Sequence, residues 1–428
     1  MAKVLVSDTY LAAIADAIRA QNASSETYKV DEMADTIRNF TFKDNNPDSS
    51  GGGNSIGNVS FANGTQWTAS NITTGIDAIW EFDNLFLATG NGTYTSLDGK
   101  VWTKDSDVKL SYVEYHKGMY LATAANRKGF YRSFDGKNWI ACGPACTATE
   151  TMATECLYIG YGNGMWIAAI WYEDYADFMN CEMVVKTQYS MDGINWYNTN
   201  LTAQMGGLYY AEGVWVAPTD YEGVYYSLDG KNWIHSNLTS DGFIMAHNAD
   251  GVWVTGSYYS DNGLYYSYDG KTWAQTNITT QNLSRLDYVN NLWFASVYEY
   301  NGSDYVNQTY FSEDGITWEL INVDGAWIDS AYCNGRVWLA VSDDALLYSN
   351  SGKLWQTVSE SISWSSINCI YYANGLWIVG VWDGYWYSTN GIDWYTTDST
   401  TGLRQIYYSN GIWIALSSGA LFYSVAWE

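Results

Sequence analysis

Histidine and proline are almost absent from this sequence, with three residues of each among 428. So few histidines argue against a metal site built from imidazole ligands. Basic residues are also scarce, because 20 Lys and Arg stand against 46 Asp and Glu and leave a formal net charge of −26. Nucleic acids and anionic membrane surfaces are bound by concentrated positive charge, so we expect neither as a partner.

Long apolar runs are missing as well. No stretch approaches the roughly 18 to 20 apolar residues that a membrane helix needs. The N-terminus mixes charged and apolar positions and does not form a secretory leader. We therefore expect synthesis in a cytoplasm without a signal peptide.

Cysteine is limited to six irregularly spaced residues. Cys142 and Cys146 could form a metal-binding or redox pair, but no second pair or neighbouring histidine completes a zinc set. We expect reduced, structural thiols, and we predict neither a metal ion nor a cofactor.

Aromatic residues and glycine are abundant, with 23 Trp, 38 Tyr and 39 Gly. This composition is typical of half-buried strands joined by glycine turns.

Three regions differ in character. Residues 1–42 have apolar positions at helical spacing, among them Ile14 and Ile18, and predict a small α-helical hairpin. Residues 43–56 are rich in Gly, Ser and Asn and predict a flexible linker. Residues 57–428 are strand-like throughout.

The strand-like region is built from a repeat. A box of the form Ser-x-Asp-Gly-x-x-Trp ends at Trp102, Trp139, Trp196, Trp233, Trp273 and Trp318. Two weaker copies end at Trp355 and Trp394, and a degenerate copy, FANGTQW, ends at Trp67. Between the boxes lies a second element, a turn followed by an aromatic residue. Its nine copies are about 41 residues apart.

Each repeat contains four short strand signals separated by glycine turns. Asn-Gly and Asp-Gly suit two-residue hairpins, and four antiparallel strands in a unit of this length describe a propeller blade. We count about nine blades, which exceeds the usual four to eight. The last unit ends at Glu428 without a fourth strand, whereas the segment around Trp67 is a fourth strand with no blade before it. We predict that this N-terminal strand pairs with the last unit and closes the ring.

The aspartates of the box are predicted to fasten hairpins and not to catalyse a reaction. A carboxylate and a hydroxyl that flank a glycine turn can hydrogen-bond to the backbone of that turn. Ser351 and Asn390 replace the aspartate in two copies, which suits hydrogen bonding and does not suit a catalytic acid. The structural aspartates are Asp98, Asp135, Asp192, Asp229, Asp269 and Asp314.

This pattern resembles the Asp-box, or BNR repeat, of sialidase-like and sortilin-like propellers. The resemblance covers residues 56–428 and implies an all-β Asp-box propeller of four-stranded blades, here preceded by the helical hairpin. The family form usually keeps an extra residue between Asp and Gly, which this sequence lacks. The resemblance implies structure only, because in enzymes of the family the boxes lie away from the active face.

Several functions are compatible with such a propeller. A sialidase needs three arginines around the substrate carboxylate, but this chain has only seven Arg, two of them within residues 1–42. A polysaccharide-degrading glycoside hydrolase needs two placed carboxyl groups, and the many acidic residues here single out none. A propeller of sortilin type would bind a protein or peptide in its channel. We favour binding over catalysis and predict no catalytic residue.

Binding is favoured by the places where the repeat is broken. The connections between the second and third strands, opposite the Asp-Gly turns, vary in length and are rich in aromatic and acidic residues. Aromatic rings stack on sugar rings, and tyrosine offers rigid contact area at low entropic cost; alternatively, these rings only cover loop backbone. The predicted ligand-binding residues are Trp171, Tyr172, Asp174, Tyr175, Tyr221, Tyr258, Tyr259, Tyr298, Tyr300, Tyr305, Trp327, Trp364, Trp382, Asp383 and Tyr385.

Four Asn-x-Thr sequences each begin four residues after a box Trp. They match glycosylation sequons, but their periodic position predicts that they cap the crossing from one blade to the next. The four asparagines are Asn71, Asn200, Asn237 and Asn277.

The N-terminal segment MAKVLVSDTYLAAIADAIRA resembles the start of tail proteins in phages and prophages of Gram-positive gut bacteria. This resemblance implies that residues 1–42 attach the chain to a phage baseplate or tail protein. We predict a receptor-binding protein, or adhesin, of the virion tail that is made in the host cytoplasm and acts extracellularly. Its propeller would recognise a bacterial surface carbohydrate during host adsorption. Such adhesins commonly form trimers, which multiply weak sugar contacts.

Overall fold

The described part of the chain consists of β-strands joined by turns and loops. The computed structural model describes residues 64–83, 85–146, 156–177, 180–240, 242–258, 262–280, 282–300, 305–321, 328, 330–342, 345–358, 367–396 and 402–425. Within these ranges no helix occurs that could cross a membrane. The predicted helical hairpin and the predicted linker lie outside the described residues.

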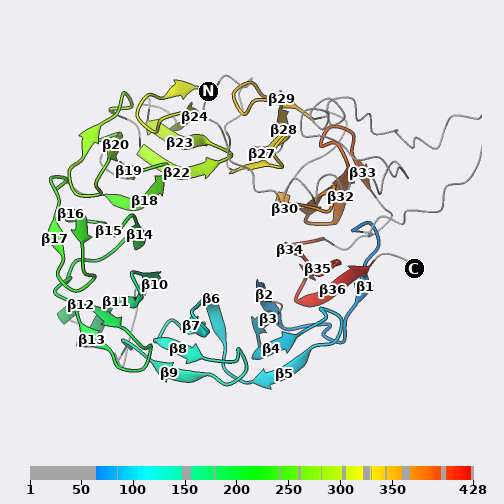
Figure 1. Ribbon diagram of the computed structural model, residues 1–428, viewed down its shortest axis with the longest axis horizontal. Helices are drawn as coiled ribbons and strands as arrows, with labels where there is room; N and C mark the ends of the chain where they lie inside the picture. Colours follow the sequence, from blue (N-terminus) through cyan, green and yellow to red (C-terminus); the bar gives the residue numbers. More distant parts are fainter. Residues whose placement is uncertain are drawn as a thin grey trace, which may run out of the picture. The chain divides into compact units, whose positions relative to one another are not determined.

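Nine four-stranded antiparallel sheets form the blades of a propeller (Figure 1). The first strand of each blade lies nearest the central axis (Figure 1). The predicted all-β fold with nine blades is thereby confirmed. The first five blades are β2 (Ile76–Phe82), β3 (Leu85–Gly90), β4 (Thr93–Ser96) and β5 (Thr103–Ser106); β6 (Leu110–His116), β7 (Met119–Ala124), β8 (Phe130–Ser133) and β9 (Ile140–Cys142); β10 (Cys156–Gly162), β11 (Met165–Asp177), β12 (Asn180–Ser190) and β13 (Tyr197–Asn198); β14 (Tyr209–Ala211), β15 (Val214–Thr219), β16 (Gly223–Ser227) and β17 (Ile234–His235); and β18 (Phe243–Ala249), β19 (Val252–Ser257), β20 (Leu264–Ser267) and β21 (Ala274–Gln275).

Blade 9 takes its outer strand from the start of the described chain. That strand, β1 (Thr68–Ala69), pairs antiparallel with β36 (Ala420–Val425), with Thr68 opposite Tyr423. Blades 6 to 9 are β22 (Asn282–Val289), β23 (Leu292–Tyr300), β24 (Tyr305–Ser312) and β25 (Glu319–Leu320); β26 (Ser330–Cys333), β27 (Trp338–Ser342), β28 (Ala345–Ser349) and β29 (Gln356–Thr357); β30 (Ile367–Ala373), β31 (Leu376–Val381), β32 (Gly384–Ser388) and β33 (Tyr395–Thr396); and β34 (Gln405–Ser409), β35 (Ile412–Ser417), β36 and β1.

The long connections between the second and third strands of blades 3 and 6, which the sequence analysis takes as loops, are extensions of hairpins. In blade 3, β11 and β12 pair as far as Asp177 and Asn180. In blade 6, β23 and β24 pair as far as Tyr300 and Tyr305. Aromatic residues favour a pleated ladder, so inserted segments that are rich in them lengthen the strands. The interpretation of both insertions as loops is therefore corrected.

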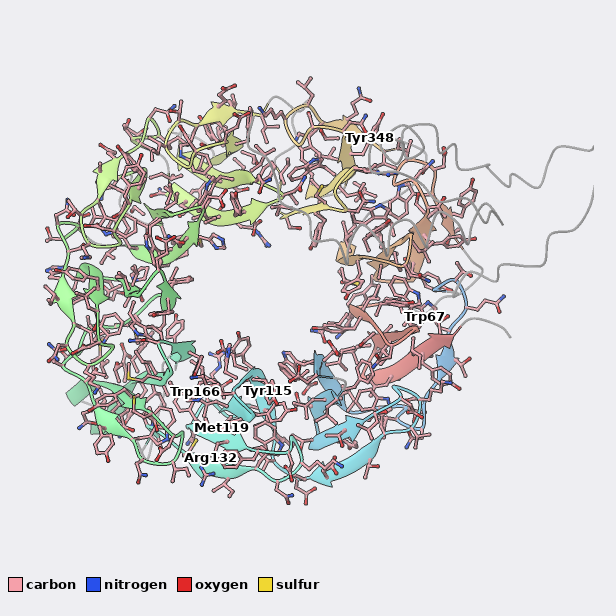
Figure 2. All side chains as sticks on the ribbon, viewed as in Figure 1. Trp67, Tyr115, Met119, Arg132, Trp166 and Tyr348 are labelled. Atoms are coloured by element: carbon pink, nitrogen blue, oxygen red, sulfur yellow. The ribbon has the colours of Figure 1, made fainter. Side chains whose placement is uncertain are left out.

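The hydrophobic core lies between neighbouring blades. Nine clusters of buried apolar residues each join two neighbours, and one of them joins blade 9 to blade 1 through Ile414 and Ile76. Met119 and Trp166 belong to the cluster between blades 2 and 3 (Figure 2). The second strand of a blade is covered on both sides, and β7, β15 and β31 are buried at every position. Each fully buried large apolar side chain stabilises the fold by about 1.5–3 kcal/mol.

The turn between the first and second strands is a tight hairpin with a left-handed backbone. In blade 4, Glu212 and Gly213 have φ angles of 50° and 82°. Both central residues of a type I′ turn need such angles, which is why glycine follows Asn, Asp or Glu here. The tyrosine before this turn packs on the tryptophan after it, and the ring centroids of Tyr210 and Trp215 are 4.8 Å apart.

Each Ser-x-Asp-Gly-x-x-Trp box is a turn that bonds to its own backbone. In blade 6, Ser312 Oγ donates to Asp314 Oδ1 and accepts the N–H of Gly315, both at 2.9 Å. Asp314 Oδ1 accepts the next two backbone N–H groups at 2.8 Å. Trp318 Nε1 donates to the Gly315 carbonyl at 3.2 Å. The carboxylate therefore satisfies donors that the turn would otherwise leave to water.

Two boxes without aspartate keep the same bonds. Asn390 Oδ1 accepts the two following N–H groups at 2.9 Å each. Ser351 Oγ accepts the corresponding pair at 3.2 and 3.4 Å. An uncharged oxygen is sufficient for this geometry.

The glycine of each box packs against the second strand of the preceding blade. A Cβ added to Gly99 in blade 1 would lie 2.3 Å from Cδ1 of Ile414 in blade 9. Gly64, in the degenerate box of blade 9, has the same relation to blade 8, with Cδ1 of Ile378 at 2.4 Å. Real Cβ contacts this short do not occur, so the box glycine marks a place where two blades meet without room for a side chain.

The four periodic asparagines each join one blade to the next. Asn237, on the crossover from blade 4 to blade 5, donates from Nδ2 to the Trp273 carbonyl of blade 5 at 2.9 Å and accepts the Trp273 N–H at 2.8 Å. The same two bonds link Asn71 to Trp102, Asn200 to Trp233 and Asn277 to Trp318. The capping role predicted for these asparagines is confirmed, and their amide nitrogens are occupied by these bonds.

Replacing a box glycine will destabilise the propeller through packing as well as backbone strain. Gly352 and Gly375 have the same φ of 76°. A Cβ added to Gly352 would lie 2.8 Å from the Leu292 side chain and 3.0 Å from the Trp338 ring, whereas a Cβ added to Gly375 would meet nothing within 4 Å. We expect Gly375→Ala to cost about 1 kcal/mol from the left-handed backbone, and Gly352→Ala about 1–3 kcal/mol more from overpacking. Thermal unfolding of both variants measures the difference. Equal melting temperatures would contradict the packing account.

The box carboxylates will make stability depend on acid. Burial would raise the pKa of Asp229, but the backbone N–H groups of Asn232 and Lys231 and the Asn232 amide outweigh it and lower the pKa to about 2. Because the folded pKa is depressed below 3.8, the charged form stabilises the fold above about pH 4, and this contribution is lost as the pH falls toward 2.

We therefore expect Asp229→Asn to lower stability by about 1 kcal/mol at pH 7, since this carboxylate is solvent-exposed. The difference in stability between wild type and variant should become smaller as the pH falls from 5 to about 2. Melting temperatures across that range provide the measurement, with Asp383→Asn as a control on an exposed loop. A gap that does not change with pH would rule out a charge effect.

Candidate functional site

The antiparallel strands assign the connections to two opposite faces of the propeller. The boxes and the type I′ turns lie on one face, which we call the box face. The connections between second and third strands lie on the other, which we call the loop face. This is the face on which the sequence predicts ligand-binding residues.

Trp382 and Tyr221 present their rings to solvent on the loop face. They lie in short turns of blades 8 and 4, and their side chains are 66% and 63% exposed. The guanidinium of Arg404 lies 5.3 Å from the centroid of the Trp382 ring. Asp383, next in the same turn, is also exposed. An indole beside a cation and a carboxylate can stack on an apolar ring face and hydrogen-bond to the hydroxyls around it.

Tyr258 and Tyr298 lie against each other across blades 5 and 6. Their ring centroids are 5.7 Å apart at an interplanar angle of 73°, and the Tyr298 hydroxyl donates to the Tyr258 carbonyl. Both side chains are half-buried. This pair joins two blades and leaves part of each ring at the surface.

Tyr172 and Tyr385 are packing residues, which differs from the sequence expectation. Tyr172 is 1% exposed and Tyr385 is 2% exposed. The Tyr385 hydroxyl donates to the Thr65 carbonyl at 3.0 Å. Both residues belong to strands whose alternate positions face a neighbouring blade, so their rings fill the core and are closed to a surface ligand. Trp171, one position before Tyr172, is half-buried.

The other predicted ligand-binding residues are described in part or not at all. Asp174, Tyr175, Tyr300 and Tyr305 have assigned strand positions, but their side chains lie outside the described set. Tyr259, Trp327 and Trp364 lie outside the described residues altogether.

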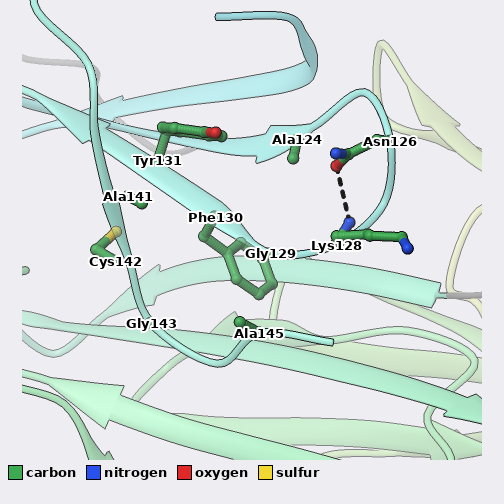
Figure 3. Close-up of a pocket in the computed structure, with 10 residues that line it drawn as sticks. All are labelled: Ala124, Asn126, Lys128, Gly129, Phe130, Tyr131, Ala141, Cys142, Gly143 and Ala145. Carbon is green, nitrogen blue, oxygen red and sulfur yellow. Dashed lines mark hydrogen bonds between the residues drawn. The ribbon is translucent and has the colours of Figure 1, made fainter. Parts of the chain in front are cut away.

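A groove on blade 2 was not anticipated from the sequence. It consists of two neighbouring hollows of about 650 and 300 Å³. The larger hollow is lined by the crossover from blade 1, residues 106–109, and by the connection after β7. The smaller one, lined by Phe130, Tyr131 and Cys142, is drawn in Figure 3. Ala124, Asn126 and Tyr131 line both hollows.

Hydrogen bonds fix the walls of this groove. The N–H of Ala125 bonds to the Lys109 carbonyl at 2.9 Å, and the N–H of Cys146 bonds to the Lys128 carbonyl at 3.2 Å. Asn126 Oδ1 accepts the N–H of Lys128 at 3.1 Å (Figure 3). A signal for the groove was available in the sequence, because Asn126-Arg127-Lys128 is a basic connection in an acidic chain.

A half-buried carboxyl group, that of Glu114, lies on the innermost strand of the same blade. The Tyr112 hydroxyl donates to Glu114 Oε1 at 3.1 Å, and His116 Nε2 lies 3.5 Å from Glu114 Oε2. Burial raises the pKa of Glu114 and lowers the pKa of His116, because it disfavours the charged form of each group. Such a carboxyl can act as a general acid, but glycoside hydrolysis also needs a second carboxyl group, and these two partners of Glu114 are a phenol and an imidazole.

The cysteines whose side chains are described are free thiols. They are Cys142, Cys146, Cys333 and Cys369. Burial raises the pKa of Cys142 and Cys369 to about 12, which makes both unreactive at neutral pH. Among the described residues, no group of three or more His, Cys, Asp or Glu side chains could hold a metal ion.

Comparison with known proteins gives structural likeness alone. No protein-family model matches the sequence, and no curated protein matches it significantly. Among solved structures, the computationally designed Ika8 protein is 10% identical, with a TM-score of 0.47, covering 85% of this chain and 100% of its own. BamB from Moraxella catarrhalis is 9% identical, with a TM-score of 0.44, covering 84% of this chain and 98% of its own. YCF48 from Cyanidioschyzon merolae is 11% identical, with a TM-score of 0.41 over the same shares. Likeness at this level says nothing about function.

Proposed function

We propose that this chain is a receptor-binding protein of a phage tail, and that its propeller binds a bacterial surface glycan on the loop face. The observation that carries the proposal is the exposed indole of Trp382. A large aromatic side chain that is 66% exposed in a two-residue turn contributes little to packing. Sugar rings have apolar faces that stack on such a ring.

The surroundings of Trp382 support this chemistry. The Arg404 guanidinium lies over one face of the ring and Asp383 follows it, so one donor and one acceptor of hydrogen bonds accompany the other, stacking face. Tyr221 adds a second exposed ring four blades away. Separate rings around a disc suit a repetitive polymer, because each contact is weak and several can be made at once.

The tail assignment rests on the resemblance of residues 1–42 to the start of phage tail proteins. In this proposal the segment attaches the chain to the baseplate or tail, and residues 43–56 tether the propeller to it. A homotrimer would present three propellers to one cell surface and raise avidity. No membrane or nucleic-acid partner is part of the proposal.

Two structural details belong to the same proposal. The boxes make this propeller a divergent member of the Asp-box group, supported by the Ser, Asp, Gly and Trp bonds repeated from blade to blade. The pairing of β1 with β36 closes the ring, because it supplies the outer strand that blade 9 would otherwise lack.

Polysaccharide cleavage is the second candidate function, and Glu114 is the observation that favours it. Burial raises the pKa of Glu114, and an upward shift is the direction that suits a general acid. Binding remains the stronger proposal, because the described partners of Glu114 do not include a second carboxylate.

Removing the exposed indole will weaken glycan binding without unfolding the protein. On an array of bacterial surface polysaccharides, we expect Trp382→Ala to weaken binding by about tenfold, as for a central aromatic contact. Tyr268→Ala is a matched control, since this ring is also 66% exposed but lies in a box on the opposite face. Melting temperatures should stay within a few degrees of wild type. If both variants lose glycan binding equally, or if neither loses it, the loop face is not the binding surface.

Incubation with the bound polysaccharide will release no new reducing ends. A binding protein leaves the glycosidic bonds intact, whereas a hydrolase using Glu114 would generate reducing sugar that Glu114→Gln abolishes. Reducing-sugar assays on wild type and Glu114→Gln measure this directly. Release that depends on Glu114 would replace the binding proposal with the hydrolase.

A further inference from the structure

Positive charge is concentrated in one short part of this acidic chain. Eight of the 20 Lys and Arg residues lie between Lys100 and Lys137, with only four Asp and Glu among them. The basic residues of this stretch are Lys100, Lys104, Lys109, Lys117, Arg127, Lys128, Arg132 and Lys137. A protein of net charge −26 has no general need for a local excess of cations.

Two of these lysines line the groove on the loop face of blade 2. Lys109 lines the larger hollow and Lys128 the smaller. Both side chains are exposed, and within the described ranges neither forms an ion pair. The carboxylate in the larger hollow, Asp107, is already paired with Lys104 at 2.6 Å. The groove therefore presents unpaired positive charge.

The rest of the lining suits a sugar unit that carries a charge. Tyr131 faces both hollows and offers an aromatic ring for stacking. Cys142 is a neutral thiol, because burial raises its pKa to about 12. Lys186 of blade 3 adds a cation at the edge, donating to the Ala145 carbonyl at 2.9 Å. Ala145 itself lines the smaller hollow.

The backbone beside Lys128 is held in an unusual conformation. Arg127, between Asn126 and Lys128, has a φ of 57°, which costs free energy for a residue with a side chain. Other non-glycine residues with positive φ lie mainly in the type I′ turns on the box face. The strained residue in this connection keeps Lys128 tied to Asn126 at the mouth of the groove.

We propose that the groove on blade 2 is a subsite for the anionic group, a carboxylate or a phosphate, of the surface polysaccharide; this inference rests on the proposed function. Lys109 and Lys128 bind the charge, and Tyr131 supports the sugar that bears it. Charges more than a Debye length away, about 8–10 Å at physiological salt, are screened. The local lysines therefore decide binding in the groove, while the acidic surface elsewhere disfavours other placements of an anionic polymer.

Dextran, carboxymethyl-dextran and dextran phosphate of equal length test the proposal on the full chain. We expect both charged polymers to bind at least about tenfold more tightly than plain dextran at low salt, and to lose this advantage at about 0.5 M NaCl. The double variant Lys109→Gln/Lys128→Gln should weaken charged-polymer binding by about tenfold or more. Inorganic phosphate is tested as a small anion, and we expect it to compete only weakly with the charged dextrans for binding.

The matched control is Lys137→Gln/Lys231→Gln, which removes the same charge from exposed lysines on the box face. It should leave binding unchanged. No preference for charged dextrans, equal loss in both double variants, or binding of inorganic phosphate as tight as that of the polymers would overturn the subsite.

These outcomes separate the subsite from the receptor function. Bacterial polysaccharides that bind regardless of charge and without loss in Lys109→Gln/Lys128→Gln would overturn the subsite and leave the receptor function in place. Charged dextrans that bind as expected, together with an array on which no bacterial polysaccharide binds, would support the subsite and contradict the receptor.

Discussion

The ring depends on the close contact between the glycine of each box and the preceding blade. Serine and aspartate bond to the turn and hold its backbone, and the glycine then meets the neighbouring second strand with no side chain between them. A single hairpin would be marginal alone. Nine such contacts, with apolar clusters behind them, make each blade the support of the next.

The fastening boxes and the proposed recognition surface occupy opposite faces because each strand reverses direction. The boxes and the interblade asparagines need a side-chain oxygen or amide at fixed positions to make their hydrogen bonds. The connections between second and third strands do not contain these repeated hydrogen bonds, so they differ in length and charge. The exposed indole of Trp382 and the basic groove near Lys128 both arise there.

The blade count, the type I′ turns and the asparagine bridges could be predicted because they follow from local pattern. Asn-Gly and Asp-Gly favour a turn, and a period of about 41 residues counts the units. Burial could not be predicted in the same way. Tyr172 and Tyr385 are aromatic residues of the kind expected to bind a ligand, yet both are buried in the core. Trp382 has similar neighbours in sequence and stays at the surface.

The sequence by itself determined the repeated blade, its turns and its fastening residues, since those interactions span a few residues and recur. Only the tertiary structure decided that two insertions extend hairpins, which aromatic rings are open to a ligand, and that residues 106–109 and Lys128 flank one groove. The physical reason is that exposure and charge proximity depend on what packs beside a residue. The side chains of a neighbouring blade come from a distant part of the sequence, so the local pattern around a residue does not show what covers it.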